Sequence, residues 1–148
     1  MNGFWLAAVI ILVSGVLTAM QAPTNAKLAA AAGSPINAAL ISFAVGALAL
    51  VAVTLALRAR PDLAALKALP WYAWLGGLYG AVFVAAAAYA APRIGVASTL
   101  TLLIAGQLIA AVVIDQIGGF GVPVRPLSAA KLFGVGLVIA GVLLVRRG

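Results

Sequence analysis

Long apolar runs, separated by short polar or Gly/Pro-rich breaks, fill the chain from end to end. Each run approaches the length of about 20 residues with which an α-helix crosses a hydrocarbon core about 30 Å thick. The runs do not alternate apolar and polar residues with period two, which argues against a membrane β-barrel. The breaks therefore predict one all-α transmembrane domain over residues 1–148, whose five helices cover residues 3–32, 35–57, 70–91, 95–117 and 129–145.

The sharpest break is Gly33-Ser34-Pro35, because Gly suits the position after a helix, Ser an N-cap and Pro the first helical position. The helix before it is unusually long. At 1.5 Å per residue it extends for about 45 Å, which exceeds the thickness of the hydrocarbon core. Pro23 removes one of its backbone hydrogen bonds, so we expect a kink there.

A polar stripe is expected on this first helix, since spacings of four, three and four place Ser14, Thr18, Gln21 and Asn25 on one face. The stripe has two interpretations. It either forms hydrogen bonds between helices, worth about 0.6 kcal/mol each, or faces a solute or water. Lys27 is expected to extend its ammonium group to the membrane interface.

Two further features lie on the third and fourth helices. The third helix has small residues at every fourth position from Ala73 to Ala85, which predicts a tightly packed face. Its aromatic residues Tyr79 and Phe83 lie on an adjacent face and belong either to packing or to a pocket. Gln107 falls near the middle of the fourth helix, where an amide needs partners for two donors and an acceptor. Helix association and solute binding both fit Gln107.

Composition places the whole chain in a membrane. Hydrophobic residues make up 66% of the 148 residues and charged residues 7%, whereas a soluble domain has about a quarter charged residues. The net charge of +7 comes from cations at the edges of apolar runs, which predicts contact with lipid headgroups and no nucleic-acid partner. Asp115 is expected to form a surface ion pair with basic residues of the following loop, with a proton-coupling role as the alternative.

The sequence contains no Cys and no His, which removes thiolate metal sites, the usual proton shuttle and any Ser-His triad. We therefore expect no catalytic residues, no metal and no cofactor, and the chain is not predicted to be an enzyme.

Five motifs carry a resemblance to a known family: QAPTNAKL, GSPINAALISFAVG, PWYAWLGGLYGA, APRIGVAST and AGQLIAAVVIDQIG. Together they resemble the short, half-length bacterial members of the drug/metabolite transporter superfamily, the YdcZ-like (EamA-related) inner-membrane proteins. The resemblance implies a multi-pass protein of the bacterial inner (plasma) membrane whose five helices equal half of a ten-helix transporter. It also implies assembly from two such units. The four-helix multidrug exporters of this superfamily use a Glu in the first helix, where this chain offers only Gln21.

The leading functional hypothesis is a small-solute transporter that works by alternating access, as an antiparallel homodimer or with a homologous half-length partner. Its site would combine Ser14, Thr18, Gln21, Asn25, Tyr79, Phe83 and Gln107. The alternatives are a non-transporting assembly or accessory subunit, and a flippase for a lipid or lipid carrier.

Charge balance motivates the antiparallel arrangement. One face of the five-helix topology carries five cations and the other four: Arg58, Arg60, Lys67, Arg125 and Lys131 against Lys27, Arg93, Arg146 and Arg147. So small a difference predicts insertion in both orientations. A fixed orientation, or a partner of opposite charge bias, is the alternative.

Overall fold

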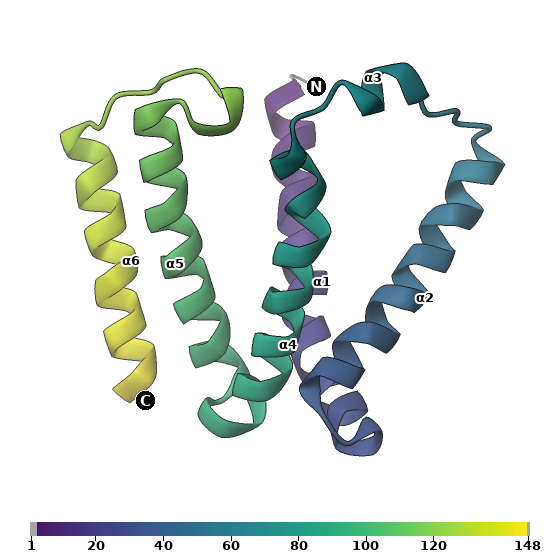
Figure 1. The fold of residues 1–148 in the computed structure, drawn as a ribbon. Coiled ribbons are helices and arrows are strands. Elements are labelled where there is room, and N and C mark those ends of the chain that lie inside the picture. The colour runs from purple at the N-terminus through teal and green to yellow at the C-terminus, as the bar shows by residue number, and fades with distance from the viewer. Residues whose placement is uncertain (1–2, 148) are drawn as a thin grey trace. The chain divides into compact units, whose positions relative to one another are not determined.

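The structure, a computed structural model, describes residues 3–147, and their side chains as far as Val145. Every regular element in this range is helical, which confirms the all-α class expected from the apolar runs. The chain divides into two compact units, a first unit up to Arg93 and a second unit from Ile94 onward. Figure 1 shows the helices of both units.

The first unit holds three long helices and two short ones: α1 (Gly3–Ala32), α2 (Pro35–Ala56), α3 (Leu63–Lys67), the 3₁₀ helix η1 (Trp71–Leu75) and α4 (Gly76–Ile94), whose last residue opens the second unit. The α1–α2 turn has the predicted chemistry. Gly33 is left-handed at φ +81°, and Ser34 Oγ accepts from Asn37 N at 3.1 Å. Asn37 Nδ2 donates to Ala32 O at 2.8 Å, so one of the last carbonyls of α1 is satisfied.

The third predicted helix differs most from the structure. The expected range 70–91 begins as η1 and continues through Pro92 to Ile94. Pro92 lies in the last turn, where a missing backbone donor disturbs little of the helix that follows it. The helix ends where Gly95 takes a positive φ of +83°, a backbone conformation that favours glycine. The short helix α3 was not predicted. Asp62 caps it, with Oδ1 accepting from the backbone N–H of Ala64 at 2.9 Å and of Ala65 at 3.1 Å.

Small side chains form the buried centre of the first unit. The buried apolar residues among those described are six alanines and one valine, shared by α1, α2 and α4: Ala22, Ala38, Ala39, Val84, Ala87, Ala88 and Ala91. Alanine lets helix backbones approach closely, which is how helices associate in lipid. The face of α4 that this centre covers runs through Val84 and Ala87. Val84 lies seven residues after Gly77, and Ala88 seven after Ala81, so this face overlaps the small-residue face that the sequence predicted to pack. Ala73 and Gly77 at its start are exposed.

The helices α1 and α2 meet near their connecting turn and diverge away from it (Figure 1). Accordingly Ala38 and Ala39, next to the turn, are buried, whereas residues 43–56 of α2 are exposed throughout. Large apolar side chains such as Leu48 and Leu55 are 71% and 72% exposed. Exposing this apolar surface to water would cost free energy, whereas lipid tails cover it without that cost.

The second unit is a helical hairpin of α5 (Val96–Ile117) and α6 (Ala129–Arg147), with the 3₁₀ turn η2 (Gly119–Gly121) between them. The two helices lie side by side in Figure 1. The predicted helix ranges 95–117 and 129–145 differ from these bounds by one residue at the start of α5 and two at the end of α6. Gly118 closes α5 in the left-handed conformation, at φ 65°, as expected for a glycine after a helix.

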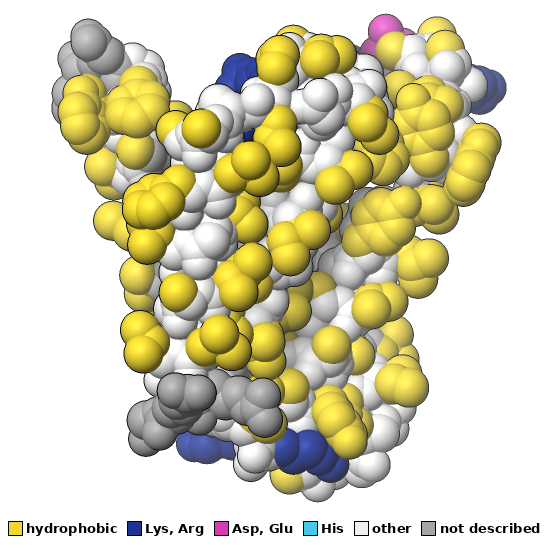
Figure 2. All heavy atoms as spheres, turned by 90° about the vertical axis from the view of Figure 1, so that its left-hand side faces the viewer, with side chains coloured by type: hydrophobic (Ala, Val, Ile, Leu, Met, Phe, Trp, Pro, Cys, Tyr) yellow, Lys and Arg dark blue, Asp and Glu magenta, His cyan; other side chains and the backbone are white. Residues whose placement is uncertain are grey.

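Four helices in the described part are long and apolar enough to span a membrane: Gly3–Ala32, Pro35–Ala56, Trp71–Ile94 and Val96–Ile117. The apolar stretch Ala129–Val145 of α6 is shorter. On the face shown in Figure 2, the Lys and Arg side chains lie at helix ends, and the stretches between them carry hydrophobic and uncharged side chains. This pattern is that of a multi-pass helical membrane protein.

Candidate functional site

The hydroxyl groups of the polar stripe are bonded within α1 itself. Ser14 Oγ donates to Ile10 O at 2.9 Å, and Thr18 Oγ1 donates to Ser14 O at 2.8 Å. Thr24, beside Pro23, repeats the pattern by donating to Met20 O. Such back-bonding satisfies a hydroxyl inside an apolar phase, and it often bends helices. The two hydroxyls of the stripe therefore keep only acceptor lone pairs for a further partner.

The two amides of the stripe are different, because neither Gln21 nor Asn25 makes a side-chain hydrogen bond to any described residue. Exposure decreases along the stripe: Ser14 is exposed, Gln21 is half-buried, and Asn25 is 4% exposed beside Ala22. No side-chain nitrogen or oxygen among the described residues is both sealed from the surface and unpaired. The unpaired Asn25 amide atoms thus retain a small accessible area, which a water molecule or a solute can reach.

This observation bears on the two interpretations of the stripe. Bonds between helices of one chain would pair these four side chains with α2 or α4, and the described residues contain no such bond. The stripe therefore does not hold the first unit together. A partner from outside the first unit remains for its amides.

The aromatic pair of α4 lies in the same unit. Phe83 is half-buried, and Tyr79 is 55% exposed. Next to them, Ala81, Val82 and Ala85 line one wall of a groove of about 410 Å³, and Ile36, Ala39, Leu40 and Phe43 of α2 line the other. Gly80 makes close contact there, since a Cβ at this position would lie 3.0 Å from Phe43 Cζ. Tyr79 and Phe83 do not line this groove.

Gln107 belongs to the second unit and projects from the middle of α5. Its side chain is exposed and makes no hydrogen bond to a described residue. Gly106 beside it has open space where a side chain would be, and Ala110 on the same face is also exposed. An unpaired amide at this depth is costly in a lipid environment. The face around Gln107 is therefore suited to contact with a polar partner from outside the hairpin.

Asp115 is part of an ion pair, as the sequence predicted, with its Oδ2 3.3 Å from Lys131 Nζ. The backbone of the α5–α6 loop closes on the same point: Arg125 N donates to Asp115 O at 2.8 Å, and Leu127 N donates to Gln116 Oε1 at 2.6 Å. These contacts fasten the loop to the end of α5. Asp115 and Lys131 therefore help to hold the α5–α6 loop in place. Gln116 takes part in the same contacts, which the sequence did not predict.

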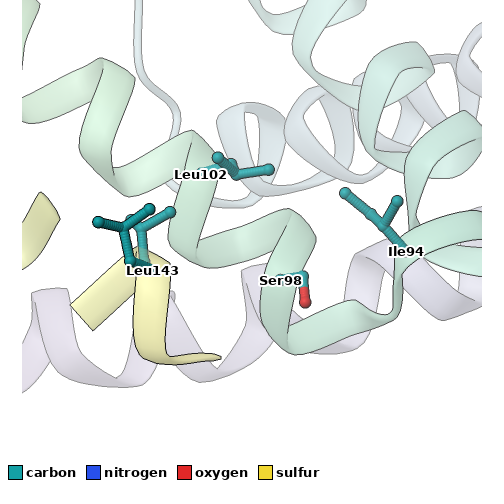
Figure 3. A pocket seen from close by; sticks show the side chains of 5 residues that line it. Ile94, Ser98, Leu102 and Leu143 are labelled. Atoms are coloured by element: carbon teal, nitrogen blue, oxygen red, sulfur yellow. The ribbon is translucent and has the colours of Figure 1, made fainter. Parts of the chain in front are cut away.

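A second groove, of about 540 Å³, lies in the second unit and was not predicted. It is lined by Ile94 at the end of α4, by Ser98 and Leu102 in the first turns of α5, and by Val142 and Leu143 near the end of α6 (Figure 3). Ser98 contributes its one hydroxyl group. The sequence did not indicate this groove, because a single Ser among apolar residues is typical of any membrane helix.

The described residues contain no cluster of His, Cys, Asp or Glu that could hold a metal ion.

The protein is a multi-pass α-helical membrane protein, as shown by its apolar helices, the uncharged polar groups within them and the cations at their ends. Comparison with known proteins places it more closely. The chain belongs to the family described as "Putative inner membrane exporter, YdcZ", whose model matches residues 6–144. It is 34% identical over 77 residues to the inner membrane protein YdcZ of Escherichia coli (strain K12).

That match covers 52% of each chain, so the chain spans about half the length of the curated relative. No solved structure matches this chain. Membership of the family confirms the resemblance read from the five sequence motifs. It also confirms a multi-pass location in the inner membrane, in agreement with the four membrane-length helices. A role in membrane transport, and no role as an enzyme, are consistent with this family.

Proposed function

We propose that this protein transports a small solute or metabolite across the bacterial inner membrane. The observation that carries the proposal is the Asn25 amide, which is 4% exposed and without a hydrogen-bonding partner among the described residues. Polar groups of a membrane helix are normally hydrogen-bonded, because an unpaired polar group in lipid costs free energy. An amide left unpaired at the end of a polar stripe is the kind of group that a passing solute can pair with.

The proposed site consists of uncharged groups. Gln21, Asn25 and Gln107 supply amide donors and acceptors, Ser14 and Thr18 supply acceptor oxygens, and Tyr79 and Phe83 supply aromatic surface. The single carboxylate within the membrane-length helices, Asp115, is held in its ion pair with Lys131. The site is thus suited to a solute recognised by hydrogen bonding and stacking. It lacks the carboxylate that a simple proton or cation exchange would use.

We further propose that the working unit is a dimer that transports by alternating access. It is either an antiparallel homodimer or a pair with a homologous half-length chain. All five long helices, α6 included, would span the membrane as one transmembrane domain, since 17 apolar residues are about the minimum for a crossing. Two observations support a dimer. The described residues bury no large side chain fully, and the hairpin of α5 and α6 leaves the face around Gln107 exposed. Paired repeats place a shared site near the midplane, beside a broken helix.

Proteoliposome assays test the transport proposal. Purified protein is reconstituted and its lumen assayed by mass spectrometry after incubation with a mixture of metabolites. We expect saturable entry of at least one solute, and at least a tenfold loss of entry in Gln21→Ala and Gln107→Ala. If neither substitution alters solute entry, while both dissociate the oligomer, the amides serve assembly and the proposed site is wrong.

Topology reporters fused after Gly148 test the antiparallel arrangement separately. We expect signal from both sides of the membrane, because the loop charges are nearly balanced. Adding two Lys beside Arg93 should shift the population toward one side. Arg146 and Arg147, which enter this charge count, have side chains outside the described part. Signal from one side alone, with no shift after the added charges, contradicts the antiparallel homodimer and leaves the paired homologue.

A further inference from the structure

The segment from Leu57 to Leu75, which joins α2 to α4, has the chemistry of a membrane interface, and we call it the interfacial segment. Its cations Arg58, Arg60 and Lys67 are exposed. Its one acidic side chain, Asp62, is engaged in capping α3. In the described part of the chain, the salt bridge found joins Lys131 to Asp115, so the three cations of the interfacial segment have no acidic partner there.

The geometry of this segment differs from that of the helices it joins. In Figure 1, α3 runs across the space between the ends of α2 and α4, transverse to both. A helix transverse to membrane-spanning helices lies along the membrane plane. Leu63, Trp71 and Trp74 are 66%, 75% and 63% exposed. Indole rings and leucines beside unpaired cations are the composition of a segment lying at the headgroup level.

Arg58 occupies a backbone conformation that disfavours it. Leu57 caps α2, and Arg58 follows at φ +52°, in the left-handed region. The carbonyls of α2 are closed by Ala59 N donating to Thr54 O at 3.0 Å and Arg58 N donating to Leu55 O at 3.1 Å. This is a Schellman motif, in which glycine is the favoured residue at the position of Arg58. A strained residue that the fold retains points to a use for its side chain.

We propose that the interfacial segment binds the phosphate headgroups of anionic phospholipids through Arg58, Arg60 and Lys67. Guanidinium groups form paired hydrogen bonds to phosphate oxygens, and an ammonium group adds a third positive charge. The strain at Arg58 is then the cost of keeping a guanidinium at the point where α2 leaves the membrane.

The double variant Arg58→Gly/Arg60→Gln tests this inference, with Arg93→Gln/Arg125→Gln as the control of equal charge. Arg93 stacks on the Tyr89 ring, 3.6 Å from its centroid, and Arg125 lies in the α5–α6 loop. Native mass spectrometry of the full chain, released from nanodiscs of phosphatidylglycerol and phosphatidylcholine in equal amounts, counts the lipids retained. The wild type and the control should retain phosphatidylglycerol several-fold over phosphatidylcholine, and the Arg58 variant should retain the two equally.

The unfolding midpoint provides the second readout, because Arg58→Gly alone relieves the left-handed strain. In a zwitterionic detergent without lipid, Arg58→Gly should unfold at a higher temperature than the wild type. After addition of phosphatidylglycerol, the wild-type midpoint should rise and that of the variant should rise less. Equal lipid retention by the wild type and the Arg58 variant overturns the inference, as does an equal loss of retention in the control pair.

Discussion

Replacing Asn25 with Ala separates a binding amide from a packing residue, because the two roles predict opposite changes in stability. A buried polar group without a partner costs about 1–3 kcal/mol. The low end applies, since the Asn25 amide keeps a small accessible area. Alanine is also a better helix former than asparagine by about 0.5 kcal/mol. The alanine variant also loses the packing contacts of the amide group, which offsets part of these two gains. We expect Asn25→Ala to raise the free energy of unfolding by about 1 kcal/mol.

Asn37 is the matched control, because it is the same residue type with a bonded side chain. Its Nδ2 donates to Ala32 O at 2.8 Å. Asn37→Ala loses that bond, worth about 1 kcal/mol, and regains about half of it in helix propensity. We expect a net loss of about 0.5 kcal/mol. The two alanine variants should therefore change stability in opposite directions, by amounts that differ by about 1.5 kcal/mol, the sum of the two estimates.

Transport supplies the second half of the comparison. Losing one hydrogen bond to a solute, at about 1.4 kcal/mol, lowers affinity about tenfold. Asn25→Ala should therefore lower transport per folded molecule about tenfold, whereas Asn37→Ala should leave it unchanged. Unfolding is measured by titration of mixed micelles with sodium dodecyl sulfate, and transport in proteoliposomes with a metabolite mixture. The reasoning is refuted if Asn25→Ala destabilises the protein more than Asn37→Ala does, with transport per folded molecule unaltered.

Three further substitutions test other parts of the account. Pro23→Ala restores one backbone bond in α1, so we expect equal or greater thermal stability with slower turnover; unchanged turnover would make the proline incidental to transport. Gly77→Ala should stabilise α4 by about 0.5–1 kcal/mol, because open space surrounds Gly77. Gly80→Ala should leave the stability unchanged or lower it, since the new Cβ would lie 3.0 Å from a ring carbon of Phe43. Equal effects of the two substitutions on the unfolding midpoint would contradict that contact. Asp115→Asn should cost about 0.5 kcal/mol, because the ion pair with Lys131 is partly exposed and screened, and the pH profile of transport should not move; a shifted profile would assign Asp115 to proton coupling.

The helices could be predicted from the sequence because apolar run length and Gly/Pro punctuation act locally. The turn at Ser34 illustrates this, since each of its residues is suited to its place by its own backbone chemistry. The short helix α3 escaped prediction because five residues carry too little periodicity. Its one signal was the capping Asp62 before a run of helix-forming residues. Pro92 suggested a helix end, but a proline so close to Gly95 interrupts only the last turn.

The candidate site was less predictable than the helices, because burial and pairing depend on neighbours that spacing does not reveal. The spacing placed Ser14 and Asn25 in one stripe, yet the structure leaves Ser14 exposed and buries Asn25. The hydroxyls bond back to their own helix, which the sequence left open. For Gln107 the depth in the helix could be predicted, but its exposure depends on how α5 and α6 pack.

The proposed function is that this chain carries a solute through a membrane. The most direct test is counterflow in proteoliposomes of the purified protein, preloaded with unlabelled metabolites and diluted into the same mixture in isotope-labelled form. We expect transient, saturable accumulation of at least one labelled solute, absent from empty liposomes, lowered in Asn25→Ala and retained in Asn37→Ala. Labelled uptake no faster than the leak into empty liposomes, from protein shown to be folded, would contradict it.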